Sequence, residues 1–140
     1  MPDRRVVARY RIEPCSLFER VIHTVTLVTV DSNYRLEVVE RDCSVRKQKR
    51  RFLAMNRIEV DEQLAILRDA TVPAFPVSEP VCDGWYSELM VTGENSTITL
   101  GWWVITPKGA EKFGDFAYWL EKAAGLSDDD EVQALITIQI

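Results

Sequence analysis

The segment from Val21 to Val30, VIHTVTLVTV, constrains the fold more than any other part of the sequence. Val, Ile and Thr are branched at Cβ, so they fit a pleated strand and lose rotamer freedom in a helix. The turn-forming residues Asp31 to Asn33 follow, and apolar and polar residues then alternate from Tyr34 to Asp42. This pattern predicts an antiparallel hairpin of strands 21–30 and 34–42.

Alternation of apolar and polar side chains indicates further strands. In the first of them, Val6, Ala8, Tyr10 and Ile12 share one side, and we expect Pro14 to end it because proline cannot donate to a ladder. A turn at residues 93–95 predicts a second hairpin. The additional strands are expected at residues 4–12, 52–57, 85–92, 96–105 and 132–140.

Two segments have the spacing of amphipathic helices. Val60, Leu64 and Leu67 recur at helical intervals, which predicts a helix from about residue 60 to residue 70. In the second helix, Thr106 is expected as the N-cap and Pro107 as the first helical residue, with Gly125 ending the helix in a left-handed conformation. The apolar stripe of this second helix consists of Phe113, Phe116, Ala117, Leu120 and Ala124.

Together these elements predict an α+β fold, a mainly antiparallel sheet of six to seven strands with two helices packed on one face. At 140 residues, 46% of them apolar and 28% charged, the chain matches a single domain over residues 1–140. The longest apolar run is too short to cross a membrane and no secretion signal is evident, so we expect a cytoplasmic protein.

The two faces of the predicted sheet differ in composition. On strand 96–105, one set of side chains is expected beneath the helices: Ile98, Leu100, Trp102 and Val104. The second face is expected to be rich in Thr and aromatics and partly exposed. Its expected members are Thr97, Thr99, Gly101, Trp103 and Ile105, joined by Thr24, Thr26, Tyr86, Glu88 and Met90.

No complete catalytic set is visible in the sequence. His23 is the only histidine, which excludes a site with two histidine ligands and leaves a Cys-His pairing with Cys15 or Cys82 as the thiol mechanism available. Carboxylates are plentiful, but nothing selects one pair for acid-base work. We expect no metal and no cofactor, and the alternative to a binding protein is a small hydrolase or transferase with a carboxylate or Cys-His site.

A basic run follows Cys43, with Arg46, Lys47, Lys49, Arg50 and Arg51 in six residues. Five cations so close together could follow a phosphate backbone, which makes nucleic-acid binding through a loop at 46–51 a second alternative. The sequence pI of about 4.9 argues against it. A solvated hairpin loop, or an edge strand guarded by charge, is the simpler explanation of the run.

Adjacent tryptophans in a strand point to opposite faces, so Trp102 and Trp103 cannot share one core. We therefore expect a small binding or interaction protein that uses the second face, with a protein partner or a second copy of itself. Residues 1–57 carry a net charge of +6 and residues 58–140 a net charge of −11, and the acidic total suggests an immunity or antitoxin-like protein that blocks a basic nuclease. The candidate binding residues are Trp103, Tyr86, Trp85 and Arg50.

Overall fold

The computed structural model describes residues 3–14, 21–72 and 85–126. These residues form an α+β architecture with a six-stranded antiparallel sheet and two helices, which confirms the predicted fold class. The strands are β1 (Arg4–Pro14), β2 (Val21–Val30), β3 (Asn33–Asp42), β4 (Lys47–Ala54), β5 (Trp85–Thr92) and β6 (Thr97–Trp103). The helices are α1 (Arg57–Arg68) and α2 (Glu111–Ala123).

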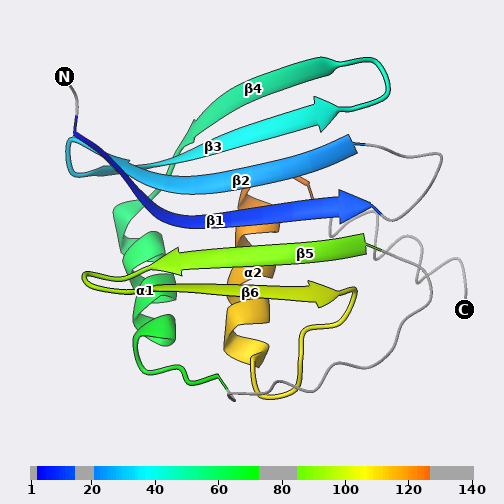
Figure 1. The fold of residues 1–140 in the computed structure, drawn as a ribbon. Coiled ribbons are helices and arrows are strands. Elements are labelled where there is room, and N and C mark those ends of the chain that lie inside the picture. The colour runs from blue at the N-terminus through cyan, green and yellow to red at the C-terminus, as the bar shows by residue number, and fades with distance from the viewer. Residues whose placement is uncertain (1–2, 15–20, 73–84, 127–140) are drawn as a thin grey trace, which may run out of the picture.

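The strands lie in the order β4-β3-β2-β1-β5-β6, and every neighbouring pair is antiparallel. Both helices lie behind the sheet in Figure 1, so they cover the same face. In this strand order, β1 lies in the middle of the sheet, between β2 and β5. Both predicted hairpins, β2 with β3 and β5 with β6, are confirmed.

The alternation in β1 is interrupted by a bulge between Val6 and Ala8. Val6 pairs with Val28, whereas Ala8 pairs with Leu27, so the side of the sheet changes between them. The expectation that Val6 shares a side with Ala8 and Tyr10 was therefore wrong. The strand also continues to Pro14 instead of ending at residue 12.

The basic run forms the edge strand β4, which confirms the expected alternative of an edge strand guarded by charge. The predicted loop at 46–51 with a strand at 52–57 was wrong. Only Arg46 belongs to the turn, with a φ of 56°. The pairing with β3 explains why cations suit this strand, because Lys47 lies opposite Asp42 and Lys49 lies opposite Glu40.

Both helices begin away from their expected starts. Helix α1 begins three residues early, since the Asn56 side chain accepts a hydrogen bond from the Glu59 backbone N–H. Helix α2 begins at Glu111 and not at Pro107, because the Ala110 N–H donates to the Pro107 carbonyl and closes a separate turn first. Thr106 is therefore not the N-cap.

The end of α2 and its buried stripe are as predicted. Gly125 has a φ of 74°, its N–H donates to the Lys122 carbonyl, and the Leu126 N–H donates to the Glu121 carbonyl. These two bonds form a Schellman motif. All five residues of the predicted stripe are buried against the sheet: Phe113, Phe116, Ala117, Leu120 and Ala124.

Strand β6 ends at Trp103 because Val104 adopts a φ of 57°, which is strained for a β-branched residue. The expectation that Val104 and Ile105 extend the strand was wrong. The predicted strand at 132–140 lies outside the described residues. Neither described helix is long and apolar enough to span a lipid bilayer.

Candidate functional site

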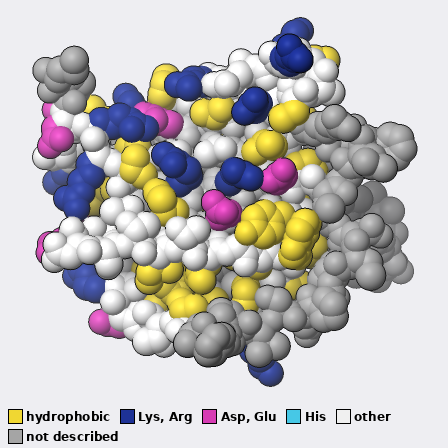
Figure 2. Space-filling model, viewed as in Figure 1, with side chains coloured by type: hydrophobic (Ala, Val, Ile, Leu, Met, Phe, Trp, Pro, Cys, Tyr) yellow, Lys and Arg dark blue, Asp and Glu magenta, His cyan; other side chains and the backbone are white. Residues whose placement is uncertain are grey.

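The sheet face turned away from α1 and α2, here called the open face, is the candidate site. Figure 2 views this face directly and shows basic side chains over β1 to β4, with acidic side chains between them. The registers give six arginines and three glutamates on it. These are Arg4, Arg9, Arg11, Arg35, Arg41 and Arg50, with Glu13, Glu37 and Glu88. The open face is therefore cationic, although the whole chain carries a net charge of −5.

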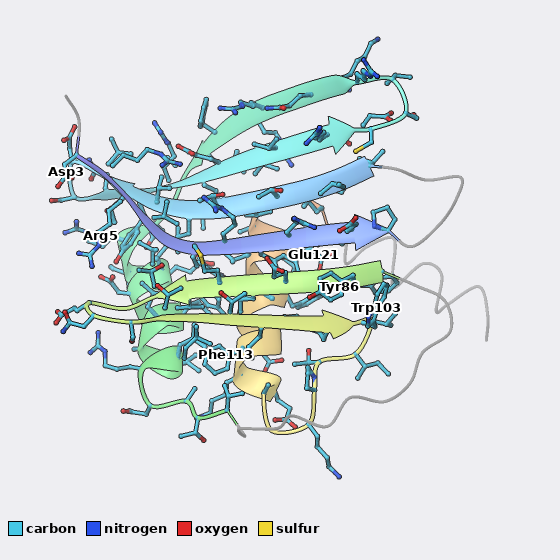
Figure 3. All side chains as sticks on the ribbon, viewed as in Figure 1. Asp3, Arg5, Tyr86, Trp103, Phe113 and Glu121 are labelled. Atoms are coloured by element: carbon cyan, nitrogen blue, oxygen red, sulfur yellow. The ribbon has the colours of Figure 1, made fainter. Side chains whose placement is uncertain are left out.

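Tyr86 and Trp103 form an aromatic pair at one end of the open face. They lie directly opposite each other on β5 and β6, with ring centroids 5.1 Å apart and an interplanar angle of 56°. Figure 3 shows the two side chains together at the same end of these strands. The Trp103 side chain is 46% exposed. A hollow of about 240 Å³ lies beside the pair, lined also by Glu13 and Pro14.

Gly101 determines where the Tyr86 ring can lie. A Cβ atom on Gly101 would collide with the Tyr86 hydroxyl and the ring carbon that bears it. The phenol therefore extends across β6 over the bare backbone of this glycine. The absence of a side chain at 101 positions the aromatic pair.

Glu37 is held between two arginines on the open face. Its carboxylate accepts hydrogen bonds from Arg4 and Arg35, each at 2.6 Å. The hydrogen bond from Arg4, reinforced by that from Arg35, lowers the pKa of Glu37 to about 2. The Arg35 guanidinium also lies 4.7 Å from the centroid of the exposed Phe52 ring.

A second hollow, of about 330 Å³, lies at the β3–β4 turn. Three cations line it, Arg41, Arg46 and Lys47, together with Gln48 and the exposed Cys43. The described lining contains no carboxylate, so the hollow suits an anion.

The four predicted binding residues do not form one site. Tyr86 and Trp103 are brought together as described. Trp85 pairs with Pro14 and precedes Tyr86 by one residue, so it points to the helix side of the sheet. Arg50 lies on the open face, but on the opposite edge from Trp103, roughly 24 Å away at about 4.8 Å per strand.

The structure places His23 on the helix side, opposite Glu40. A small hollow of about 130 Å³ beside it is lined also by Val38, Lys49 and Arg51. The buried Nδ1 atom of His23 has no hydrogen-bond partner among the described residues. The possible thiol partners Cys15 and Cys82 lie outside the described residues. The described residues contain no group of three or more His, Cys, Asp or Glu side chains that could hold a metal ion.

A further hollow, of about 810 Å³, lies on the helix side between α1 and the β5–β6 turn. Leu64, Leu67 and Phe113 contribute apolar surface to it, while Arg5 and Glu94 supply opposite charges. The only carboxylate in its described lining is Glu94, so a pair for acid-base catalysis does not assemble there.

Sequence reasoning missed the central arginines of the open face. Arg9 lies between Thr26 and Met90, and Arg11 lies between Thr24 and Glu88. The alternation RRVVARYRI already puts Arg9 and Arg11 on one side of their strand. It indicates a cationic binding surface only when β1 is known to lie in the middle of the sheet. Thr26, expected on a partly exposed face, is only 6% exposed, and its partners on the neighbouring strands are Arg9 and Glu37.

No protein-family model matches this chain, and no curated protein matches its sequence.

Proposed function

We propose that this chain is a binding protein and that the open face, with the Tyr86–Trp103 pair at one end, is its protein-binding surface. The supporting observation is that Trp103 remains almost half exposed while its ring packs on Tyr86. Trp and Tyr are enriched at the centres of protein interfaces, because each combines a large apolar area with a polar tip. A pair that is already positioned loses little side-chain entropy on binding.

The charge of the open face bears on the kind of partner. Its arginines outnumber its glutamates by three, so it would attract an acidic partner surface and repel a basic one. An immunity-like role against a basic nuclease would therefore need another surface. The acidic residues Glu59, Asp61 and Glu62 lie on α1, on the helix side.

The test compares two tryptophans of equal exposure. Trp103 and Trp85 are each 46% exposed, but they point to opposite sides of the sheet. The wild-type protein and the variants Trp103→Ala and Trp85→Ala would be immobilised and exposed to an extract of the cells that make the protein. We expect partners that Trp103→Ala loses and Trp85→Ala retains, whereas identical capture by all three proteins would contradict the proposal.

A second candidate is nucleic-acid binding, favoured by the cationic lining of the hollow at the β3–β4 turn. Arg41, Arg46 and Lys47 line this hollow, and Phe52 adds an exposed ring on the adjoining strand. Phosphates would bind the cations, and a base could stack on the ring. In this candidate, nucleic acid would bind to the edge strand β4 and its turn, and not to the loop predicted at 46–51.

Salt dependence tests the second candidate. Binding of a labelled single-stranded oligonucleotide should weaken steeply with salt, by about 0.7 logarithmic units per decade of salt for each phosphate contacted. Arg46→Gln should lower both the affinity and this slope, whereas Arg68→Gln, on α1, should change neither. Absence of binding at low salt would exclude this candidate without affecting the protein-binding proposal.

The enzyme alternative gains one feature, the unpartnered Nδ1 of His23 beside Glu40. The hollow beside His23 has no described cysteine in its lining. The predicted Cys-His pairing therefore depends on residues outside the described part of the chain. A screen for hydrolase activity with His23→Asn as the control would test it.

A further inference from the structure

The two edges of the sheet differ in how they are protected. The edge strand β4, KQKRRFLA, carries four cations, whereas the edge strand β6, TITLGWW, carries no charged residue. An edge strand presents unpaired N–H and C=O groups, and charged side chains along it prevent pairing with another chain. The β4 edge has this protection and the β6 edge does not.

The hydrogen bonds at the two ends of the β5–β6 hairpin identify the unpaired groups of β6. The Val104 N–H donates to the Trp85 carbonyl, and the Gly93 N–H donates to the Ser96 carbonyl. Because inward and outward groups alternate along an antiparallel strand, the backbone groups of Ile98, Leu100 and Trp102 face β5. Those of Thr97, Thr99 and Gly101 point away from the sheet.

No described strand lies beyond β6 in the sheet. The side chains at the edge are accessible too, with Ile98 43% exposed and Trp103 46% exposed. This edge therefore offers a row of backbone donors and acceptors together with apolar side chains, the combination on which strand addition depends.

We propose that β6 pairs in antiparallel orientation with β6 of a second copy of this chain, so that one sheet continues through the dimer. A two-fold axis beside Leu100 would pair all seven residues of the strand, with Thr99 of each copy opposite Gly101 of the other. The outward-facing backbone groups of these two residues then bond to each other across the axis.

The absence of charge on β6 allows a second copy to pair at this edge, whereas the cations of β4 disfavour one at the other. Pairing β4 with β4 would bring cations of the two copies together, whereas pairing β6 with β6 brings no charges together. A two-fold contact uses the same surface on both partners, so it closes as a dimer and leaves the charged β4 edges on the outside.

Sedimentation equilibrium of the full chain is the first measurement. We expect a dimer, and we expect Thr99→Lys to raise the dissociation constant about tenfold or more, because it places a strongly hydrated charge at the pairing edge. Met90→Lys is the matched control, since Met90 lies directly opposite Thr99 on β5 and one strand further from the edge. It should leave the dimer intact. A strict monomer for the wild type at millimolar concentration would overturn the proposal.

Amide hydrogen exchange identifies the surface used. In the monomer, the Thr99 and Gly101 amides should exchange quickly and the Leu100 amide slowly, since only the Leu100 N–H faces β5. Raising the protein concentration should then protect Thr99 and Gly101. A dimer with unchanged exchange at these two residues would contradict the proposal, as would protection that is already complete in the monomer.

This inference does not depend on the proposed function, because Trp103→Ala leaves every backbone group of β6 in place. Loss of a protein partner in that variant with an intact dimer would separate the two surfaces.

Discussion

The Tyr86 hydroxyl lies over Gly101 on the neighbouring strand, in the volume that a Cβ atom at position 101 would fill. Gly101→Ala should therefore displace the Tyr86 ring and alter its packing on Trp103. Because the displaced group is the end of a long side chain, we expect a loss of stability of about 1 kcal/mol or less. The near-ultraviolet circular dichroism of the aromatic pair should change clearly.

Gly93→Ala is the control for this prediction. Gly93 precedes the turn of the same hairpin, and a Cβ atom there would meet its nearest neighbour, the Ser96 carbonyl oxygen, at 3.5 Å, an ordinary contact. Its near-ultraviolet spectrum should match that of the wild type. Equal spectra for both variants would show that Gly101 does not position Tyr86.

Glu37 should make the stability of the fold sensitive to acid. Its pKa of about 2 in the folded protein lies below its usual value, so its contribution is complete above about pH 4.5 and is lost as the pH falls towards 2. Because the two arginines are partly exposed, Glu37→Gln should cost about 1 to 2 kcal/mol at neutral pH. The cost should shrink at low pH in urea titrations. Glu13→Gln, which breaks a more exposed ion pair with Arg11, should cost less.

Glu121 should act in the opposite direction. Burial beneath the sheet raises the pKa of this carboxyl group, so the folded state favours its protonated form. The ionised group weakens the fold above its folded pKa, and the penalty disappears as the pH falls through the usual range of a glutamate. Glu121→Gln should therefore stabilise the protein at neutral pH and have little effect at about pH 4. Lower stability of the variant at neutral pH would contradict this.

The start of α1 depends on the side chain of Asn56. Its Oδ1 accepts a hydrogen bond from the Glu59 N–H at 3.1 Å. Asn56→Ala should cost about 1 kcal/mol in the free energy of unfolding, as measured by thermal or urea denaturation. Asn56→Asp keeps the acceptor and should cost much less. Equal losses in the two variants would mean that the cap does not contribute.

Local patterns in the sequence predicted the elements well where one physical cause dominated. The strand at 21–30 follows from its β-branched composition and the apolar stripe of α2 from its helical spacing, and both predictions are confirmed. Gly125 was predictable because a left-handed cap requires a residue without a Cβ atom.

The errors arose where distant segments decide the outcome. In strand β4, Lys47 lies opposite Asp42 and Lys49 opposite Glu40, whereas the pattern within residues 46–51 alone allows a loop as well as an edge strand. The bulge before Ala8 depends in the same way on the register with β2.

For the candidate site, the sequence identified the aromatic pair but not its surroundings. The position of Trp103 on the second face could be predicted because two adjacent tryptophans in a strand point to opposite faces. The arginines of β1 could not be assigned to a binding surface, since alternating arginines are equally typical of any solvated strand. Only the central position of β1 places Arg9 and Arg11 in the middle of the open face.

The central position of β1 also has a consequence for how the chain acquires its fold. Its partner β5 lies far from it in the sequence, as the hydrogen bond from Tyr10 to Ser87 illustrates, which joins residues 77 positions apart. Pairing at such separation slows folding, because the entropy of closing a long loop is lost before the contacts form. During synthesis, β1 to β4 can pair as soon as they emerge. The edge of β1 that pairs with β5 has no strand partner until β5 has been made. A truncation before Trp85 should therefore aggregate instead of yielding a smaller stable sheet.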